Sequence, residues 1–396
     1  MKKNYYTSDF SKSFFINFFS DNSFNNPSFS SHDLERYFDI FIFGRSEGIF
    51  LNFLNKNKIS LNKEKLTVLE ENTKKRWLKS SLTLQSCHKI FKRLNDNDIK
   101  FMPLKGTQLI LFYDFDVSFR PIRDLDLLVL ESDIPKVVEI LYELGFFFKK
   151  FKKFSKDYRY FVNRNKYDIE PMFNENGVCI EIHYKIQYDN ICSITEEFWK
   201  NSTQESFGEY SLLKLSEEHL LLHILYHSIS KQGIDVGIQA LFDFYKLVHL
   251  PNFDIEKLIA LAIKHHLIEE LAIFFKIFKK YAGYEIKDDS LDKLSHANDC
   301  VTENCLTLFY YNNANNHSVK LYRYRFRDLF FKTFKKETIK SDVFFLRNKF
   351  IYTQVFFRRL LRNIKRYLPI LMRMIFDKKF RSDNKMTSDI LKSIKK

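Results

Sequence analysis

Residues 104–129 read Leu-Lys-Gly-Thr-Gln-Leu-Ile-Leu-Phe-Tyr-Asp-Phe-Asp-Val-Ser-Phe-Arg-Pro-Ile-Arg-Asp-Leu-Asp-Leu-Leu-Val. Asp124 and Asp126 stand two apart in a segment whose alternation predicts a β-strand. Side chains at i and i+2 of a strand point to the same face, so both carboxylates converge there. Adjacent carboxylates repel each other unless a cation lies between them, and Mg²⁺ prefers oxygen ligands. The segment therefore predicts a strand that carries a divalent metal site.

Three basic residues and a glycine turn precede the two aspartates. Lys105, Arg120 and Arg123 are cations suited to an anionic substrate, and guanidinium groups bind phosphate through paired hydrogen bonds. Gly106 permits a tight strand-to-helix turn, and Thr107 opens a helix whose first amides favour anions. We expect these five residues to bind a nucleotide. The structural alternatives are a lysine that caps a surface turn and arginines that hold one of the aspartates in a salt bridge.

A hairpin downstream supplies a third carboxylate. Residues 158–173 and 178–187 alternate in polarity and flank Asn-Glu-Asn-Gly at 174–177, which is a turn signal. In the second strand Glu181 and His183 share one face. A carboxylate from a neighbouring strand is what a metal site with two aspartates needs. The alternative is a solvent-facing strand edge; His183 is expected to orient a carboxylate or touch the substrate, because Mg²⁺ prefers oxygen ligands.

Several motifs follow one another in a fixed order along roughly residues 30–280. They are Leu104-Lys105-Gly106, Arg120-Pro121, Asp124-Leu125-Asp126-Leu127-Leu128-Val129, Gly145-Phe146, Glu181-Ile182-His183-Tyr184, and a helical segment from Leu215 through His219, His223 and His227. This ordered set resembles the core of the uncharacterised nucleotidyltransferase family within the DNA polymerase beta-like superfamily. Two departures are Thr107 in place of the superfamily's common Ser and a longer gap between Gly106 and Asp124.

The resemblance implies a transferase that moves a nucleoside monophosphate from a nucleoside triphosphate to an unknown acceptor hydroxyl, with release of pyrophosphate. It makes Asp124, Asp126 and Glu181 the catalytic and metal-binding residues for Mg²⁺ or Mn²⁺. The two aspartates would hold both cations and Glu181 one of them. Relatives in the superfamily modify antibiotics, sugars, proteins and RNA ends, and the motif does not choose among these acceptors. The alternative is a catalytically degenerate binding or scaffold protein.

The hydrophobic pattern predicts helices on both sides of a segment of strands, and with the resemblance it implies an α+β fold with a small mixed β-sheet core between helical N-terminal and C-terminal parts. The four expected regions are a helical region at 1–96, the nucleotidyltransferase core at 97–210, a helical region at 211–319 and a basic helical tail at 320–396. Within the core we expect a first strand at 99–104. A helix capped by Ser132 and stopped by Gly145 should follow the Asp124 strand.

The net charge of +15 lies in the C-terminal tail. Residues 320–396 hold 23 Lys and Arg against six Asp and Glu, a net of +17, whereas residues 1–319 hold 41 against 43. A basic segment of this kind attracts RNA or an anionic membrane surface. Residues 356–368 interleave apolar and basic side chains, which is typical of an amphipathic basic helix. The alternative is a solvated helical face that covers the core.

The remaining sequence signals place the protein in the cytoplasm, with peripheral binding to the inner face of the membrane as an option. The five cysteines form no CxxC pair, which indicates a reducing compartment. No apolar run approaches the roughly 18 residues of a membrane span, and the N-terminus lacks a signal-peptide pattern.

Some polar residues of the C-terminal half have structural interpretations. His219, His223 and His227 recur every four residues without a zinc signature, so we expect core or interface histidines. Asp243 should make a buried helix contact, and the His265-His266 pair should lie on the surface.

Overall fold

The computed structural model describes most of the first 275 residues. The described ranges are 31–43, 45–148, 168–186, 193–228, 238–268, 270–272 and 274–275. All of them belong to one compact unit, Met1–Asn316, and the second unit, His317–Lys396, lies outside the described residues. The predictions for the basic tail, for its helix at 356–368 and for most of the first hairpin strand at 158–167 therefore remain predictions.

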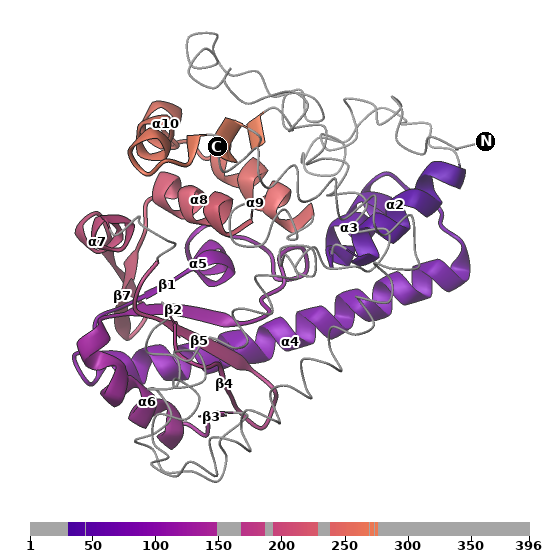
Figure 1. Ribbon diagram of the computed structural model, residues 1–396. Coiled ribbons are helices and arrows are strands. Elements are labelled where there is room, and N and C mark those ends of the chain that lie inside the picture. The colour runs from indigo at the N-terminus through magenta and orange to yellow at the C-terminus, as the bar shows by residue number, and fades with distance from the viewer. Residues whose placement is uncertain are drawn as a thin grey trace, which may run out of the picture. The chain divides into compact units, whose positions relative to one another are not determined.

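A five-stranded mixed sheet forms the centre of the unit, in the order β1-β2-β5-β4-β3 (Figure 1). Its strands are β1 Phe101–Pro103, β2 Leu125–Val129, β3 Phe147–Phe148, β4 Met172–Phe173 and β5 Cys179–His183. The pairing of β2 with β5 is parallel, and the other three pairings are antiparallel. Helices precede and follow this sheet along the chain, so the predicted α+β class is confirmed.

The two faces of the sheet differ in character. Leu125 and Leu127 of β2 pack into one hydrophobic core with α4, Lys63–Asn95, and α6, Ile134–Glu143. The alternate residues of β2, including Asp126, point to the opposite face. That face carries α5, Lys105–Phe112, which contacts both β2 and α8, Glu217–Tyr226 (Figure 1). The polar residues of the sheet therefore lie away from the main core.

Hydrogen bonds fix the ends of the helices around this core. Asn62 caps the long helix α4, because its side chain accepts a hydrogen bond from the Glu64 amide at 2.9 Å. The predicted cap of α6 at Ser132 is wrong. A short 3₁₀ turn at Glu131–Asp133 precedes that helix, and the Ser132 hydroxyl bonds the Asp133 carboxylate instead of a backbone amide. Gly145 follows the end of α6 with φ +81°, as predicted for a stop.

The predicted turn at Asn174–Gly177 is confirmed, since it joins β4 to β5 and the Asn174 amide bonds the Val178 carbonyl at 3.2 Å. A second hairpin was not predicted. It consists of β6, Thr203–Phe207, and β7, Tyr210–Lys214. The helical pattern expected from about 212 was therefore wrong at its start, and the next helix begins at Glu217.

Contacts between Tyr210 and α4 hold the second hairpin in place. The Tyr210 ring packs edge-on against Phe91 of α4 and its hydroxyl lies 2.5 Å from His88 Nδ1. These partners are more than a hundred residues away in sequence, so the local leucine pattern carried no sign of them.

Further helices surround this centre. They are α2 Ser31–Phe43, α3 Glu47–Lys56, α7 Ser193–Lys200, α9 Ile238–Val248 and α10 Ile255–Lys264. In the described part of the chain, no helix combines the length and the apolar composition that crossing a bilayer requires. The rings of Phe41 and Phe50 stack at 5.1 Å and join α2 to α3.

Helix α3 begins in close contact with the loop that leads to Asp124. A Cβ atom added at Gly48 would lie 1.7 Å from the carbonyl oxygen of Ser118. Backbone cannot yield to such an overlap as a flexible side chain can, so only glycine fits at this contact. The N-terminal helices are thereby held against the loop before β2.

Gly48→Ala should lower the free energy of unfolding by about 2 kcal/mol or more, because the new methyl group overlaps backbone. Chemical denaturation of the full chain measures the change. Glu70→Ala, an exposed substitution on α4, should stay within about 0.5 kcal/mol of the wild type and serves as the control. A Gly48→Ala protein as stable as that control would contradict the close contact.

Candidate metal and anion site

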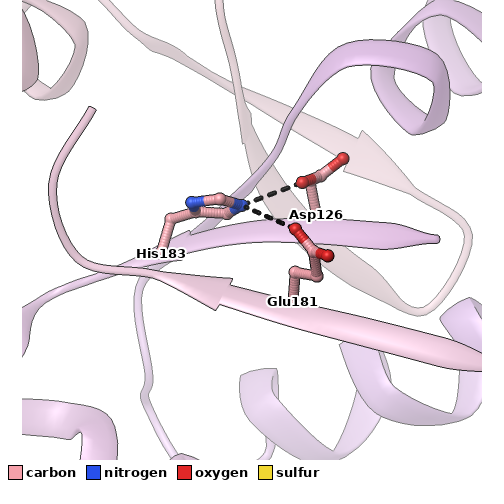
Figure 2. Close-up of side chains that lie close together, drawn as sticks. All are labelled: Asp126, Glu181 and His183. Atoms are coloured by element: carbon pink, nitrogen blue, oxygen red, sulfur yellow. Dashed lines mark hydrogen bonds and ion pairs between the residues drawn. The ribbon is translucent and has the colours of Figure 1, made fainter. Parts of the chain in front are cut away.

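The parallel pairing of β2 with β5 brings acidic residues from two strands together. Asp126 lies opposite Glu181 in the register, and His183 follows two residues later on the same face. His183 Nε2 lies 2.8 Å from Asp126 Oδ1 and 3.9 Å from Glu181 Oε2 (Figure 2). The three side chains point toward one another, and one potential ligand atom from each lies within 4.8 Å of the others.

This donor set fits a divalent cation. Two carboxylates offer the oxygen atoms that Mg²⁺ and Mn²⁺ prefer, and an imidazole suits Mn²⁺ better than Mg²⁺. The Asp126 side chain is only 4% exposed, whereas that of Glu181 is 27% exposed, so the site opens toward solvent on the Glu181 side. The geometry therefore includes His183, which the sequence assigned to orienting a carboxylate or touching the substrate.

Two polar side chains of the chain contact the buried Asp126 carboxylate. Lys105 Nζ and His183 Nε2 both lie 2.8 Å from its Oδ1 atom. Burial alone would raise the pKa of Asp126, but the charge of Lys105 and the contact with His183 hold that pKa well below its usual range. The carboxylate is therefore ionised and ready to act as a ligand.

Asp124 lies immediately before β2 and is not part of the three-residue cluster. Burial raises the pKa of Asp124, and the negative charge of Asp126 raises it further. Lys105, Arg123 and Arg120 act in the opposite direction, so Asp124 lies among the predicted anion-binding residues.

The predicted strand-to-helix turn is present, and its first residue, Lys105, is strained. Lys105 begins α5 with φ +48°, a left-handed conformation that favours glycine. Its ammonium group bonds Asp126 and not a surface carbonyl, so the surface-turn alternative is wrong. Thr107 is buried in the first turn of α5, and its hydroxyl has no hydrogen-bond partner among the described residues.

Arg120 forms an ion pair, but its partner is neither Asp124 nor Asp126, the two aspartates expected from the sequence. Its Nε donates to both carboxylate oxygens of Asp243, at 2.7 and 2.9 Å, and one Nη donates to the Pro121 carbonyl at 3.1 Å. Asp243 lies buried on α9, as predicted for a helix contact. A Cβ atom at Gly106 would lie 2.9–3.2 Å from the Arg120 guanidinium, so Gly106 leaves the space that this group occupies.

Arg123 has no such carboxylate. Its Nη2 lies 3.3 Å from the Gln239 side-chain oxygen, and its buried Nε has no hydrogen-bond partner among the described residues. Burial lowers the pKa of Arg123 to about 10, and the positive charges of Arg45, Arg120 and Arg76 contribute to the decrease. Of these neighbours, Arg45 and Arg76 come from the N-terminal helical region and carried no signal in the sequence.

The comparison with family models decides the assignment. Residues 33–283 match the model of a family described as an uncharacterised nucleotidyltransferase. The chain belongs to this family. The comparisons with curated proteins and with solved structures gave no match.

Membership in the nucleotidyltransferase family agrees with the expected resemblance and makes a nucleotide the substrate in general terms. Together with the Asp126, Glu181 and His183 cluster, it indicates a divalent metal site. The match also includes α2, α3 and α4, so the N-terminal helices belong to the family's common unit.

The histidines of this nucleotidyltransferase family member lie in the packing of its C-terminal helices, as predicted for His219 and His223. Both are buried, and each packs against the Phe198 ring, at 5.9 and 5.8 Å. The surface location expected for His265 is wrong, because its side chain is buried at the end of α10 and neither ring nitrogen has a hydrogen-bond partner in the described chain. None of them belongs to the candidate metal site.

Asp243→Asn should reduce the free energy of unfolding by about 3 kcal/mol, because it leaves the Arg120 guanidinium buried without its counter-charge. Urea titration of the full chain measures this loss. The double variant Arg120→Met with Asp243→Leu removes both charges and should recover much of the stability. A single variant that costs under 1 kcal/mol would contradict a structural role for the pair.

Buried neutral histidines should make stability fall in acid. Burial lowers the pKa of His219 and His265 below the ordinary value of 6.5. The unfolded chain therefore binds more protons as the pH falls below 6.5, and stability declines by up to about 1.4 kcal/mol per pH unit for each such histidine.

The measurement is the difference in unfolding free energy between pH 7.5 and pH 5.5. His265→Phe should reduce this difference because it removes one titrating group. Leu78→Ala, at an exposed position of α4, removes no titrating group and should leave the pH dependence as in the wild type. Equal pH dependence of the wild type and His265→Phe would exclude His265 as a source.

Proposed function

We propose that this protein transfers a nucleoside monophosphate from a nucleoside triphosphate to an acceptor hydroxyl. The observation that supports the proposal most is the register that sets Asp126 beside Glu181 on adjacent parallel strands, in a chain of the nucleotidyltransferase family. The acceptor oxygen would form a bond to the α-phosphorus while the bond to pyrophosphate breaks. The hydroxyl proton would pass to a carboxylate of the site.

The three carboxylates would have different roles in holding the cations. Asp124 and Asp126 would hold two cations, Mg²⁺ or Mn²⁺, and Glu181 would hold one of them. When bound, these cations would activate the attacking hydroxyl and neutralise the charge on the triphosphate. Because Glu181 is the most exposed member of its cluster, we place the acceptor on its side of the site. Catalysis of this kind depends mainly on positioning and charge neutralisation.

The phosphates would lie on the side of the site formed by the turn at the start of α5. Lys105, Gly106 and Thr107 form the turn at the start of α5, and Arg120 lies directly over Gly106. The amides of a helix N-terminus and the guanidinium groups of Arg120 and Arg123 are suited to phosphate oxygens. Because Lys105 already contacts Asp126, phosphates bound here would lie beside the metal ligands.

A second candidate function is a non-catalytic binding protein built on the same domain. One observation favours it, since Lys105 and His183 both contact Asp126 Oδ1 at 2.8 Å and the chain itself thus supplies partners for this carboxylate. In this case the basic residues 320–396 would engage RNA or an anionic membrane surface. Transfer of a labelled nucleotide separates the two functions, because only the first requires it.

Asp124→Asn, Asp126→Asn and Glu181→Gln should each lower nucleotide transfer at least about 100-fold, because each removes ligand charge without removing packing volume. The assay follows label from α-labelled nucleoside triphosphates into components of a cell extract, with Mg²⁺ or Mn²⁺ present. Thermal unfolding should show that each variant remains folded.

Glu175→Gln makes the same chemical change at the exposed turn between β4 and β5 and should retain full activity. Near-normal transfer by either aspartate variant would contradict the assigned site. If Glu181→Gln were active while Glu170→Gln or Asp168→Asn were inactive, the third ligand would lie on the neighbouring segment instead.

A further inference from the structure

Four arginines from three separate segments interact near the start of β2, where the charges of the other three act on Arg123. Arg120 and Arg123 belong to the loop before the strand, Arg76 to α4, and Arg45 to the turn between α2 and α3. Direct contacts hold these segments together. The Ser80 hydroxyl donates to the Arg76 carbonyl at 2.8 Å and accepts a hydrogen bond from the Ile122 amide at 3.0 Å.

The turn that carries Arg45 is fixed to the same loop. Gly48, in the first turn of α3, lies so close to the Ser118 carbonyl that no side chain fits between them. The segment from Ser118 to Arg123 therefore contacts both α4 and the start of α3. Neither helix belongs to the sheet that carries the metal ligands.

In the described part of the chain, ion pairs account for two of these four charges. Arg120 pairs with Asp243, and Arg76 pairs with buried Glu47 through two contacts of 2.6 Å. Within the described ranges, Arg45 and Arg123 have no carboxylate oxygen within 4.0 Å. Two positive charges therefore remain without an ion pair.

Hydrogen-bond donors are also left over. Among the described residues, the buried Arg123 Nε has no hydrogen-bond partner, and the third nitrogen of Arg120 and of Arg76 forms no hydrogen bond. An unpaired donor in a buried site costs free energy, and like charges close to it add to that cost. An anion with several oxygen atoms would satisfy the free donors and offset the surplus charge.

We propose that Arg45, Arg76, Arg120 and Arg123 form an anion subsite for a phosphoryl group, completed by the N-terminal helices. The subsite lies next to Asp124 and to the turn at Gly106, so its ligand would be bound beside the metal ligands. The identification of the anion as a phosphoryl group rests on the proposed function. Its source is either the triphosphate of the nucleotide or a phosphate carried by the acceptor.

Isothermal titration of the full chain with tripolyphosphate, in EDTA and at constant ionic strength, tests the subsite without requiring metal or catalysis. We expect Arg123→Met to weaken binding about 10-fold or more, and Arg45→Gln to weaken it several-fold, because each removes a charge-assisted contact. Arg93→Gln on α4 is the matched control, since Arg93 pairs with Glu143 of α6. It should bind as the wild type does.

Two further titrations identify the source of the phosphoryl group. Weaker binding of nucleoside triphosphate with Mg²⁺ in the Arg45 and Arg123 variants assigns the subsite to the nucleotide. Weaker binding of inorganic phosphate with unchanged nucleotide affinity assigns it to the acceptor.

The result that overturns the proposal is a wild type that does not bind tripolyphosphate, or a folded Arg45→Gln variant that binds it as tightly as the wild type. Because Arg45 is exposed, its variant decides the question even if Arg123→Met does not fold. Asp126→Asn separates this proposal from the proposed function, since it should keep metal-free tripolyphosphate binding while losing transfer. If the chain binds tripolyphosphate but has no transferase activity, the anion subsite is supported and the proposed enzymatic function is excluded.

Discussion

The charge of Asp126 is the constraint on which the site depends. A carboxylate this deeply buried stays ionised only where cations or strong donors surround it. The chain supplies an ammonium group from the turn before α5 and an imidazole from β5, both 2.8 Å from one oxygen. The strand order follows the same requirement, because only the parallel pairing of β2 with β5 brings His183 and Glu181 beside Asp126. The strand pairing of the sheet therefore also determines which polar side chains surround Asp126.

Residues after the sheet hold the turn at the start of α5 in place. Gln108 of α5 donates to the Leu215 carbonyl at 2.8 Å, and its side-chain oxygen accepts from the Leu215 amide at 3.3 Å. Asp243 of α9 anchors Arg120 from the same side. Contacts between residues more than a hundred positions apart thus fix a segment whose motif is local. This explains why the family unit extends well beyond the sheet.

Local rules predicted the features that depend on neighbouring residues. The i, i+2 spacing of Glu181 and His183 in β5, the turn before Val178 and the stop at Gly145 follow from backbone geometry alone. The pairing of Arg120 with Asp243 could not be predicted, because nothing in either segment identifies its partner. The second hairpin was missed for the same reason, since Tyr210 is placed by Phe91 and His88. The same spacing did not bring Asp124 into the three-residue cluster, because Asp124 lies immediately before β2 and the alternation of the strand begins at Leu125.

At position 105 the left-handed backbone favours glycine, whereas the charge of Asp126 favours lysine. Glycine would adopt φ +48° without the steric cost of a side chain, which is about 1 kcal/mol or more. Glycine would also remove the ammonium group that compensates Asp126. A chain selected only for folding would favour glycine at this turn, and a chain selected for an ionised carboxylate favours lysine. The lysine at position 105 therefore indicates selection for an ionised Asp126 over selection for an unstrained turn.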